Sequence, residues 1–113
     1  MPDAAKIRVL NDAFRSGERP GLGRILLTSG VRELTAPWPL GVATLFSIVQ
    51  RYDRFTNSND PHGEHDFGAF EFAGEKCFWK IDYYNKTLEG GSGDPADPDQ
   101  TTRVLTIMLA SEY

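Results

Sequence analysis

The sequence has one cysteine, Cys77, among its 113 residues, which excludes a disulfide within the chain. It also lacks the N-terminal pattern of a secretory signal peptide, and no apolar run approaches the roughly 20 residues that a membrane-spanning helix requires. A chain with neither disulfides nor an export signal is typical of a reducing compartment. We therefore expect a cytoplasmic protein that does not bind membranes.

An excess of positive charge is missing as well. The chain has 12 Lys and Arg against 16 Asp and Glu, which gives a net charge of −4. An acidic protein has no overall field that attracts nucleic acid. Internal repeats and low-complexity tracts are also absent, and the length suits one hydrophobic core, so residues 1–113 are predicted to form a single domain.

The first half of the chain predicts two helices with one strand between them. Asp3 can cap a helix whose apolar residues recur at helical spacing and which Gly17 ends. Arg24–Thr28 reads as a short strand, and its continuous apolar centre is typical of a strand covered on both faces. A second helix, expected to be the most buried, is predicted to begin at the end of the Pro37–Pro39 break. Its apolar stripe consists of Val42, Leu45, Phe46, Val49 and Tyr52, widened by Ile48 and Phe55.

The strongest local pattern is a β-hairpin formed by residues 66–73 and 76–84. Gly74-Glu75 fits a two-residue type II′ turn, in which the first residue has a positive φ and is usually glycine. This turn would place Phe70 opposite Trp79. It would also collect nearly all the large apolar groups of the hairpin on one face.

The end of the chain predicts a third helix. Residues 85–96 are rich in glycine and have no apolar period, which indicates a loop. Asp97 as N-cap and Pro98 at the first helical position then predict the start of a helix. Its apolar residues, expected to pack in the core, are Val104, Leu105, Ile107, Met108 and Leu109. The element order becomes α-β-α-β-β-α. The expected fold is a small α+β domain in which helices cover a three-stranded antiparallel or mixed sheet with the hairpin 66–73/76–84 at its centre.

Most residues with versatile chemistry lie in the polar loop from Asn59 to Gly68, which leads into the hairpin. Its nitrogen and oxygen donors could hold a divalent metal, with His62, His65, Asp60 and Glu64 as candidate ligands. Their spacing matches neither the zinc-protease helix nor the calcium-binding loop. We therefore expect no metal and no other cofactor. The loop is then interpreted as a turn braced by its own hydrogen bonds, as opposed to a metal site.

An enzymatic interpretation would use the same loop. His65 would act as a general base or acid, oriented by Asp66 or Glu64. A domain of this size has little room for a substrate pocket, and Cys77, on the apolar face of its strand, should be a buried inert thiol rather than a nucleophile. We expect Asp66 to be structural, because it enters the strand, and His65 and Glu64 to be exposed and replaceable.

A third interpretation is a binder of single-stranded nucleic acid. Such proteins stack bases on sheet aromatics, here Phe70, Phe72 and Trp79, amid basic residues. The surroundings of these aromatics are acidic, which favours a core role and makes nucleic acid an unexpected partner.

Four strings of residues are similar to those of a known family: Asn59–Gly68, Phe78–Tyr84, Asp94–Pro98 and Arg103–Tyr113. With them the chain resembles, from Ile7 to the last residue, a family of small, mostly alphaproteobacterial proteins, the domain of unknown function number 3768. The family motif carries over Asp60, Glu64, His65, Asp66, Trp79, Lys80, Asp82 and Tyr83, but not His62. The family has no assigned activity, and such proteins look like accessory genes of plasmids and integrative elements, often near anti-restriction and partition genes.

The resemblance implies a non-enzymatic protein-interaction module encoded by a bacterial mobile element, which could inhibit a host defence system such as CRISPR or restriction. A protein partner would bind through the acidic loop and the exposed edge of the hairpin. The expected partner-binding residues are Asp60, Glu64, His65, Lys80, Asp82 and Tyr84. The alternatives are a small metal-dependent or acid–base enzyme centred on residues 63–66 and the nucleic-acid binder.

Overall fold

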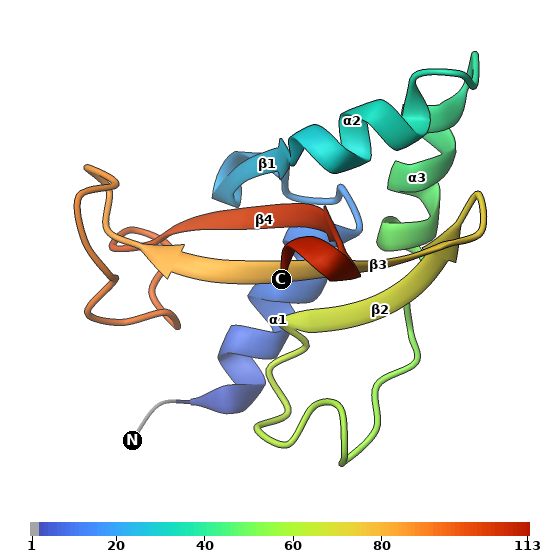
Figure 1. Ribbon diagram of the computed structural model, residues 1–113. Helices are drawn as coiled ribbons and strands as arrows, with labels where there is room; N and C mark the ends of the chain where they lie inside the picture. The colour runs from blue at the N-terminus through green and yellow to red at the C-terminus, as the bar shows by residue number, and fades with distance from the viewer. Residues whose placement is uncertain (1–2) are drawn as a thin grey trace.

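The computed structural model describes residues 3–113, which form a four-stranded mixed sheet with three α-helices (Figure 1). The helices are α1 (Ala4–Arg15), α2 (Ser29–Thr35) and α3 (Gly41–Gln50), and the strands are β1 (Gly23–Leu27), β2 (Phe67–Phe72), β3 (Glu75–Tyr84) and β4 (Thr102–Leu109). Two short 3-10 helices, η1 (Pro20–Leu22) and η2 (Ala110–Glu112), precede β1 and follow β4. The α+β class is confirmed, but the sheet has four strands, in the order β1-β4-β3-β2, instead of three.

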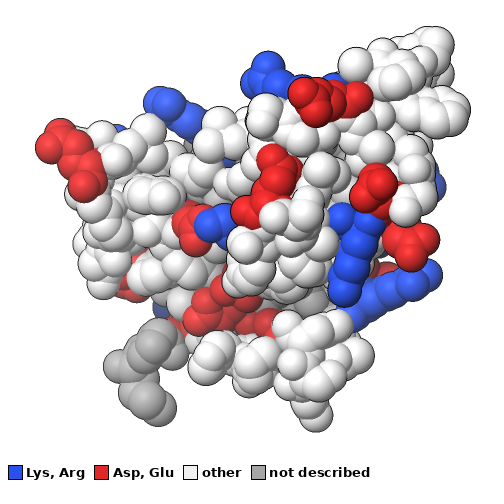
Figure 2. Space-filling view, in the orientation of Figure 1, with Lys and Arg blue, Asp and Glu red and all other residues white. Residues whose placement is uncertain are grey.

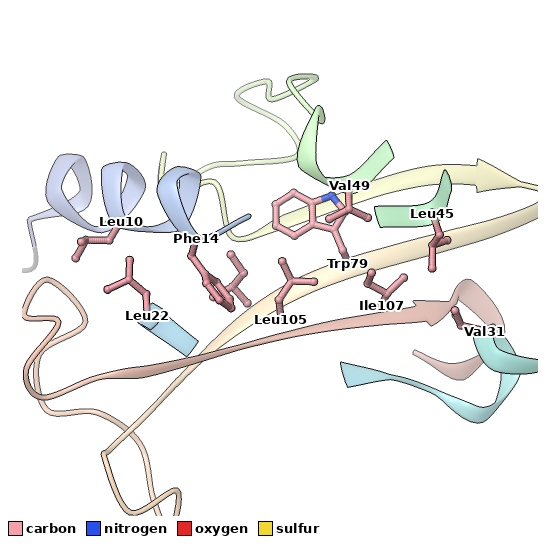
Figure 3. Packing of buried hydrophobic residues seen from close by; sticks show 10 residues of the cluster. Leu10, Phe14, Leu22, Val31, Leu45, Val49, Trp79, Leu105 and Ile107 are labelled. Atoms are coloured by element: carbon pink, nitrogen blue, oxygen red, sulfur yellow. The ribbon is translucent and has the colours of Figure 1, made fainter. Parts of the chain in front are cut away.

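The core lies between the sheet and the helices α1 and α3, which cover the same face of the sheet. Figure 3 shows side chains of both helices directed towards those of the strands. The labelled members are Leu10, Phe14, Leu22, Val31, Leu45, Val49, Trp79, Leu105 and Ile107. The short helix η2 lies on the other face, in front of β3 and β4 in Figure 1. Within residues 3–113, no helix has the length and apolar character needed to cross a membrane.

Helix α1 forms as its sequence predicts. The Asp3 side chain accepts a hydrogen bond from the Lys6 amide at 3.1 Å and so satisfies one N–H group of the first turn. Ile7, Leu10 and Phe14 form its buried face. The helix therefore carries one side of the core and holds the residues between Leu10 and Phe14 close to the sheet.

Residues 102–109 form the strand β4, so the predicted third helix is wrong. β4 is a central strand that pairs in parallel with β1 and antiparallel with β3. The capping signal makes an isolated turn instead, in which the Asp97 carboxylate accepts hydrogen bonds from the Asp99 amide at 2.9 Å and the Gln100 side chain at 2.8 Å. Both faces of β4 are largely buried, and the continuous apolar run of such a strand does not differ in periodicity from a buried helix.

The hairpin has the predicted faces but a different turn. Ala73 and Gly74 are the two turn residues and both have positive φ, 52° and 83°, which is the pattern of a type I′ turn and not of type II′. Phe70 is therefore opposite Cys77 and not Trp79. The pairing is shifted by two residues, so every side chain keeps its predicted face, because side-chain direction alternates with a period of two.

Strand β1 lies at the edge of the sheet, which corrects the expectation that it is covered on both faces. Ile25 is 43% exposed and Leu26 is 51% exposed. Gly23 begins the strand where a Cβ atom would collide with the carbonyl oxygen of Arg103 in β4. The close approach of the two backbones at this point fixes the position of β1.

Two helices lie between β1 and β2 where one was predicted. Helix α2 begins after Thr28, whose hydroxyl accepts a hydrogen bond from the Val31 amide at 3.4 Å. Helix α3 begins at Gly41, and Val42 of its predicted stripe is exposed. Because α1 buries five residues and α3 buries three, the expectation that the Pro39 helix is the most buried is also wrong.

Candidate functional site

The polar loop that precedes β2 is folded around the carboxylate of Asp60. This side chain is buried, and its Oδ1 accepts a hydrogen bond from the His65 amide at 3.2 Å. The Asp60 carbonyl accepts another from the Gly63 amide at 3.1 Å. Gly63 and His65 have φ of 67° and 56°, so the chain turns sharply at both residues. Asp60 is therefore a structural centre of the loop.

The ring of His65 lies between a carboxylate and an aromatic ring. Its Nδ1 is 2.8 Å from Oδ1 of Asp12 in α1, and because an ionised carboxylate only accepts, Nδ1 carries the proton of this hydrogen bond. The imidazole stacks on Phe55 with a centroid distance of 3.7 Å and an interplanar angle of 3°. Its side chain is 24% exposed. His65 thus fastens the loop to α1, and its side chain is partly buried where we expected an exposed one.

Arg15 extends this contact into the core. Its Nη1 is 3.0 Å from Oδ1 of Asp12, and its Nη2 donates a hydrogen bond to the Tyr52 carbonyl at 3.2 Å. The guanidinium carbon lies 5.3 Å from the ring centroid of Phe55 and 5.2 Å from that of Trp79. These distances suit cation–π attraction. The loop is therefore connected through Asp12 and Arg15 to the most deeply buried aromatic side chain.

Glu64 belongs to a second network, centred on the fully buried Asn11. The Asn11 side chain donates hydrogen bonds to the Glu64 carbonyl at 2.9 Å and to the Tyr83 hydroxyl at 2.8 Å. The Tyr83 hydroxyl in turn donates to the Glu64 carboxylate at 2.9 Å. Burial, together with this carboxylate, raises the pKa of Tyr83 well above its ordinary range, so the hydroxyl stays a donor at neutral pH. Glu64, like His65, is held by internal contacts.

Arg103 completes this second network from β4. Its side chain is fully buried, its Nε donates to Asn11 Oδ1 at 2.7 Å, and its Nη2 donates to the Pro95 carbonyl. The guanidinium carbon lies 5.3 Å from the ring centroid of Tyr83. Burial lowers the pKa of Arg103, as expected for a cation surrounded mainly by neutral groups. The network ties α1, the polar loop, β3 and β4 together, and we call the two networks the loop clasp.

Asp66 differs from its neighbours in the loop. Its carbonyl accepts a hydrogen bond from the Ile81 amide at 2.8 Å, which extends the pairing of the hairpin by one residue. Its carboxyl group is partly buried, and burial together with the charge of Glu64 raises the pKa of Asp66. Ionisation of this side chain therefore opposes folding. The structural contribution of Asp66 comes from its backbone.

The loop clasp places a carboxylate beside each ring nitrogen of His65, the residue expected to act as a general base in an enzyme. Nδ1 of His65 faces Asp12, and Nε2 lies 3.7 Å from Asp60 Oδ2, so both ring nitrogens face carboxylates. A general base needs a nitrogen within reach of the substrate proton. The residue that orients His65 is Asp12, in place of the expected Asp66 or Glu64.

The proposed metal ligands do not converge. His62 lies exposed at the tip of the loop, whereas Asp60 is buried beneath it. In the part of the chain from Asp3 to Tyr113, no group of three or more His, Cys, Asp or Glu side chains is arranged to hold a metal ion. His62, His65, Asp60 and Glu64 therefore do not form a ligand set.

The remaining candidate residues lie on the outer face of the sheet, opposite the core. Lys80 Nζ is 3.0 Å from Asp82 Oδ2, and this contact raises the pKa of Lys80. Tyr84 lies on the same side of β3, since it follows Asp82 by two residues. Figure 2 shows acidic and basic side chains interspersed on this side of the molecule. The side chains of Lys80 and Asp82 are 37% and 41% exposed, and an ion pair at such a position contributes little to stability.

The hairpin aromatics do not form an exposed row for stacking bases. Trp79 is fully buried, and a Cβ atom at Gly68, opposite it, would collide with its indole ring. Phe70 and Phe72 are partly buried against the same core. These contacts favour the core role that the acidic surroundings suggested.

Large apolar side chains are exposed at the corner between α2 and α3. Leu40 is 72% exposed and Trp38 is 55% exposed, and Val42 is exposed beside them. In Figure 2 the protrusion at the upper right, where Figure 1 places this corner, carries no charged side chain. The sequence analysis placed Trp38 in the Pro37–Pro39 break and did not predict an exposed apolar surface there.

A hollow of about 440 Å³ lies against this corner. It is lined by Trp38, Pro39, Leu40, Gly41 and Thr44, and by Phe72 and Ala73 at the tip of the hairpin. We call these residues, together with Val42, the apolar corner. It is formed by two segments that are far apart in the sequence, so no local pattern predicts it.

The protein is thus a small α+β domain whose polar loop is fastened to its core and whose apolar corner is exposed. The sequence profile of a family described as "Protein of unknown function (DUF3768)" matches residues 27–112, and the chain belongs to this family. Comparison with curated proteins and with solved structures finds no match. The matched region contains the polar loop and the apolar corner, whereas Asn11 and Asp12 of the loop clasp precede it.

Proposed function

We propose that the protein is a non-enzymatic protein-interaction module and that the apolar corner is its principal contact surface. The exposure of Leu40 and Trp38 beside a hollow carries this proposal. Burial of apolar area contributes about 25 cal/mol per Å², so exposed side chains of this size favour association with a partner. Anchors in a pocket, with an aromatic side chain among them, are the typical centre of a protein interface.

The polar loop supports the proposal in a second way. Asp60, Glu64 and His65 were expected to contact the partner, but each makes hydrogen bonds inside the protein. A side chain that is already hydrogen-bonded must lose these contacts before it binds elsewhere. Lys80, Asp82 and Tyr84 stay as candidate contacts on the outer face of the sheet, where they would lie outside the apolar centre of the interface.

Two substitutions in the apolar corner test the proposal. Leu40→Asp and Trp38→Ala should reduce capture of the physiological partner at least tenfold, which corresponds to roughly 1.4 kcal/mol of binding free energy. The matched control is Val9→Asp, because Val9 is 64% exposed on α1, away from the corner. All three variants should melt near the wild-type temperature. Equal capture by the wild type and both corner variants would contradict the proposal.

Inhibition of a host defence system stays a prediction of the family resemblance. If the protein opposes restriction or CRISPR, its expression should protect an incoming plasmid, and Leu40→Asp should remove that protection while Val9→Asp retains it. The enzymatic alternative predicts instead that a divalent metal shifts the proton resonances of His62 and His65 in a titration. We expect these resonances to stay in place.

A further inference from the structure

The outer edge of β1 has the composition of a strand inside a sheet. Ile25 and Leu26 point to opposite faces because they are successive residues in a strand, and both are exposed. Edge strands are usually protected by charges, proline or a bulge. In β1 the sequence Gly-Arg-Ile-Leu-Leu offers only Arg24 for this purpose. A continuous apolar centre is typical of a strand whose two faces are both covered.

We propose that β1 pairs antiparallel with β1 of a second copy of this chain, around a two-fold axis at Ile25. The two four-stranded sheets would become one continuous sheet. This inference concerns the edge of the sheet and is independent of the apolar corner.

The direction of the backbone groups supports the pairing. The Thr28 amide donates to the Ile107 carbonyl of β4, so the N–H and C=O groups of every second residue, Leu26 and Arg24, also face β4. Those of Gly23, Ile25 and Leu27 consequently face the outer edge. Ile25 is the middle residue of this outward-facing row. At one end of the row, the Leu27 carbonyl accepts a hydrogen bond from Arg32 Nε at 3.3 Å.

The strand is complementary to its own copy in this register. With Ile25 opposite Ile25 of the second copy, Gly23 lies opposite Leu27 and Arg24 lies opposite Leu26, so all five residues of β1 are paired. One face then brings the two isoleucines together. On the other face each Arg24 can cover a Leu26 with its aliphatic stem, and the two arginines do not oppose each other.

The face of the sheet beside β1 leaves room for side chains of a partner strand. A hollow of about 270 Å³ opens beside the strand on its outer face, lined by Arg24, Leu26, Tyr84, Leu88 and Val104. The close contact of Gly23 with β4 holds the strand in place, so little conformational freedom is lost on pairing. Tyr84, one of the expected partner-binding residues, lies in this hollow.

A charge exchange at position 25 tests the pairing and its register. In sedimentation equilibrium the wild type should reach twice the protomer mass of 12.6 kDa with rising concentration. Ile25→Lys or Ile25→Glu alone places like charges opposite each other and should stay monomeric, whereas an equimolar mixture of the two should restore the dimer. Val9→Lys and Leu40→Asp should still form dimers, which separates this inference from the proposed function.

Amide hydrogen exchange provides the second measurement. The Ile25 amide should gain at least tenfold protection with rising concentration, whereas the Leu26 amide, which faces β4, should be protected at every concentration. A wild-type protein that stays monomeric up to about 1 mM would overturn the proposal. So would a dimer that Ile25→Lys leaves unchanged, or a mixture of the charged variants that does not associate.

Discussion

Replacement of His65 by alanine should lower the free energy of unfolding by about 2 kcal/mol. The hydrogen bond between Nδ1 and Asp12 contributes about 1 kcal/mol at this partly exposed position. Loss of the contact between the ring and Phe55 exposes apolar area and adds about 1 kcal/mol. His65 has a φ of 56°, a left-handed conformation that histidine adopts more often than alanine, so a part of the loss comes from the backbone.

His65→Gly separates the side chain from the backbone. Glycine adopts a φ of 56° without a steric penalty, so this variant should lose the same contacts and yet be more stable than His65→Ala. In thermal unfolding, 2 kcal/mol corresponds to about 8 °C for 113 residues with an unfolding entropy of about 2.1 cal/mol/K per residue. His62→Ala, at the exposed tip of the loop, is the control and should change the melting temperature little. A His65→Ala protein that melts with the wild type would refute the loop clasp.

Three further predictions concern the core and the loop. Gly68→Ala should lose about 1–3 kcal/mol in urea unfolding, because the added Cβ would collide with the Trp79 indole, whereas Gly21→Ala, which adds a Cβ in open space, should lose little; equal losses would contradict this packing. Asp66→Asn should be more stable than the wild type at neutral pH. The raised pKa of Asp66 means that ionisation opposes folding as pH rises through it, so the advantage should vanish below about pH 4, and an advantage that persists in acid would argue against this cause. Cys77 is buried, and burial raises the pKa of its thiol, so a thiol reagent should label it far more slowly in the native than in the unfolded protein; rapid native labelling would show that its face is accessible.

Local chemistry explains which parts of the fold could be predicted. The Asp3 cap and the apolar spacing of Ile7, Leu10 and Phe14 define α1 without reference to the rest of the chain. The faces of the hairpin also follow from the alternation of its side chains. Its turn type was predicted wrongly because glycine suits both type I′ and type II′ turns, and Ala73 gives no sign of its positive φ.

The errors arise where distant contacts decide the structure. Residues 102–109 form a strand because β1 and β3 flank them, and the turn signal at Asp97 precedes a strand as readily as a helix. Ile25 and Leu26 have the sequence of a covered strand, although among residues 3–113 they pair with β4 alone, at the edge of the sheet. No local sequence pattern predicts the order of the strands in the sheet.

The candidate site shows the same limit. The carboxylates and His65 of the polar loop resemble a functional cluster in the sequence, because their partners Asn11 and Asp12 lie more than 50 residues earlier. One signal was available: Asn11 follows Ile7 by four residues, so it lies on the buried face of α1. A polar side chain at such a position indicates a buried hydrogen-bond network. Its partners Arg103 and Tyr83 could not be named without the structure.

Parallel measurement of partner binding and melting temperature for Leu40→Asp and His65→Ala tests the central claim most directly. If the apolar corner binds the partner and the polar loop is structural, Leu40→Asp should keep the wild-type melting temperature and lose the partner. His65→Ala should melt earlier and, at a temperature well below its transition, bind the partner as the wild type does. The opposite result, in which folded His65→Ala loses the partner and Leu40→Asp retains it, would place the functional site in the polar loop.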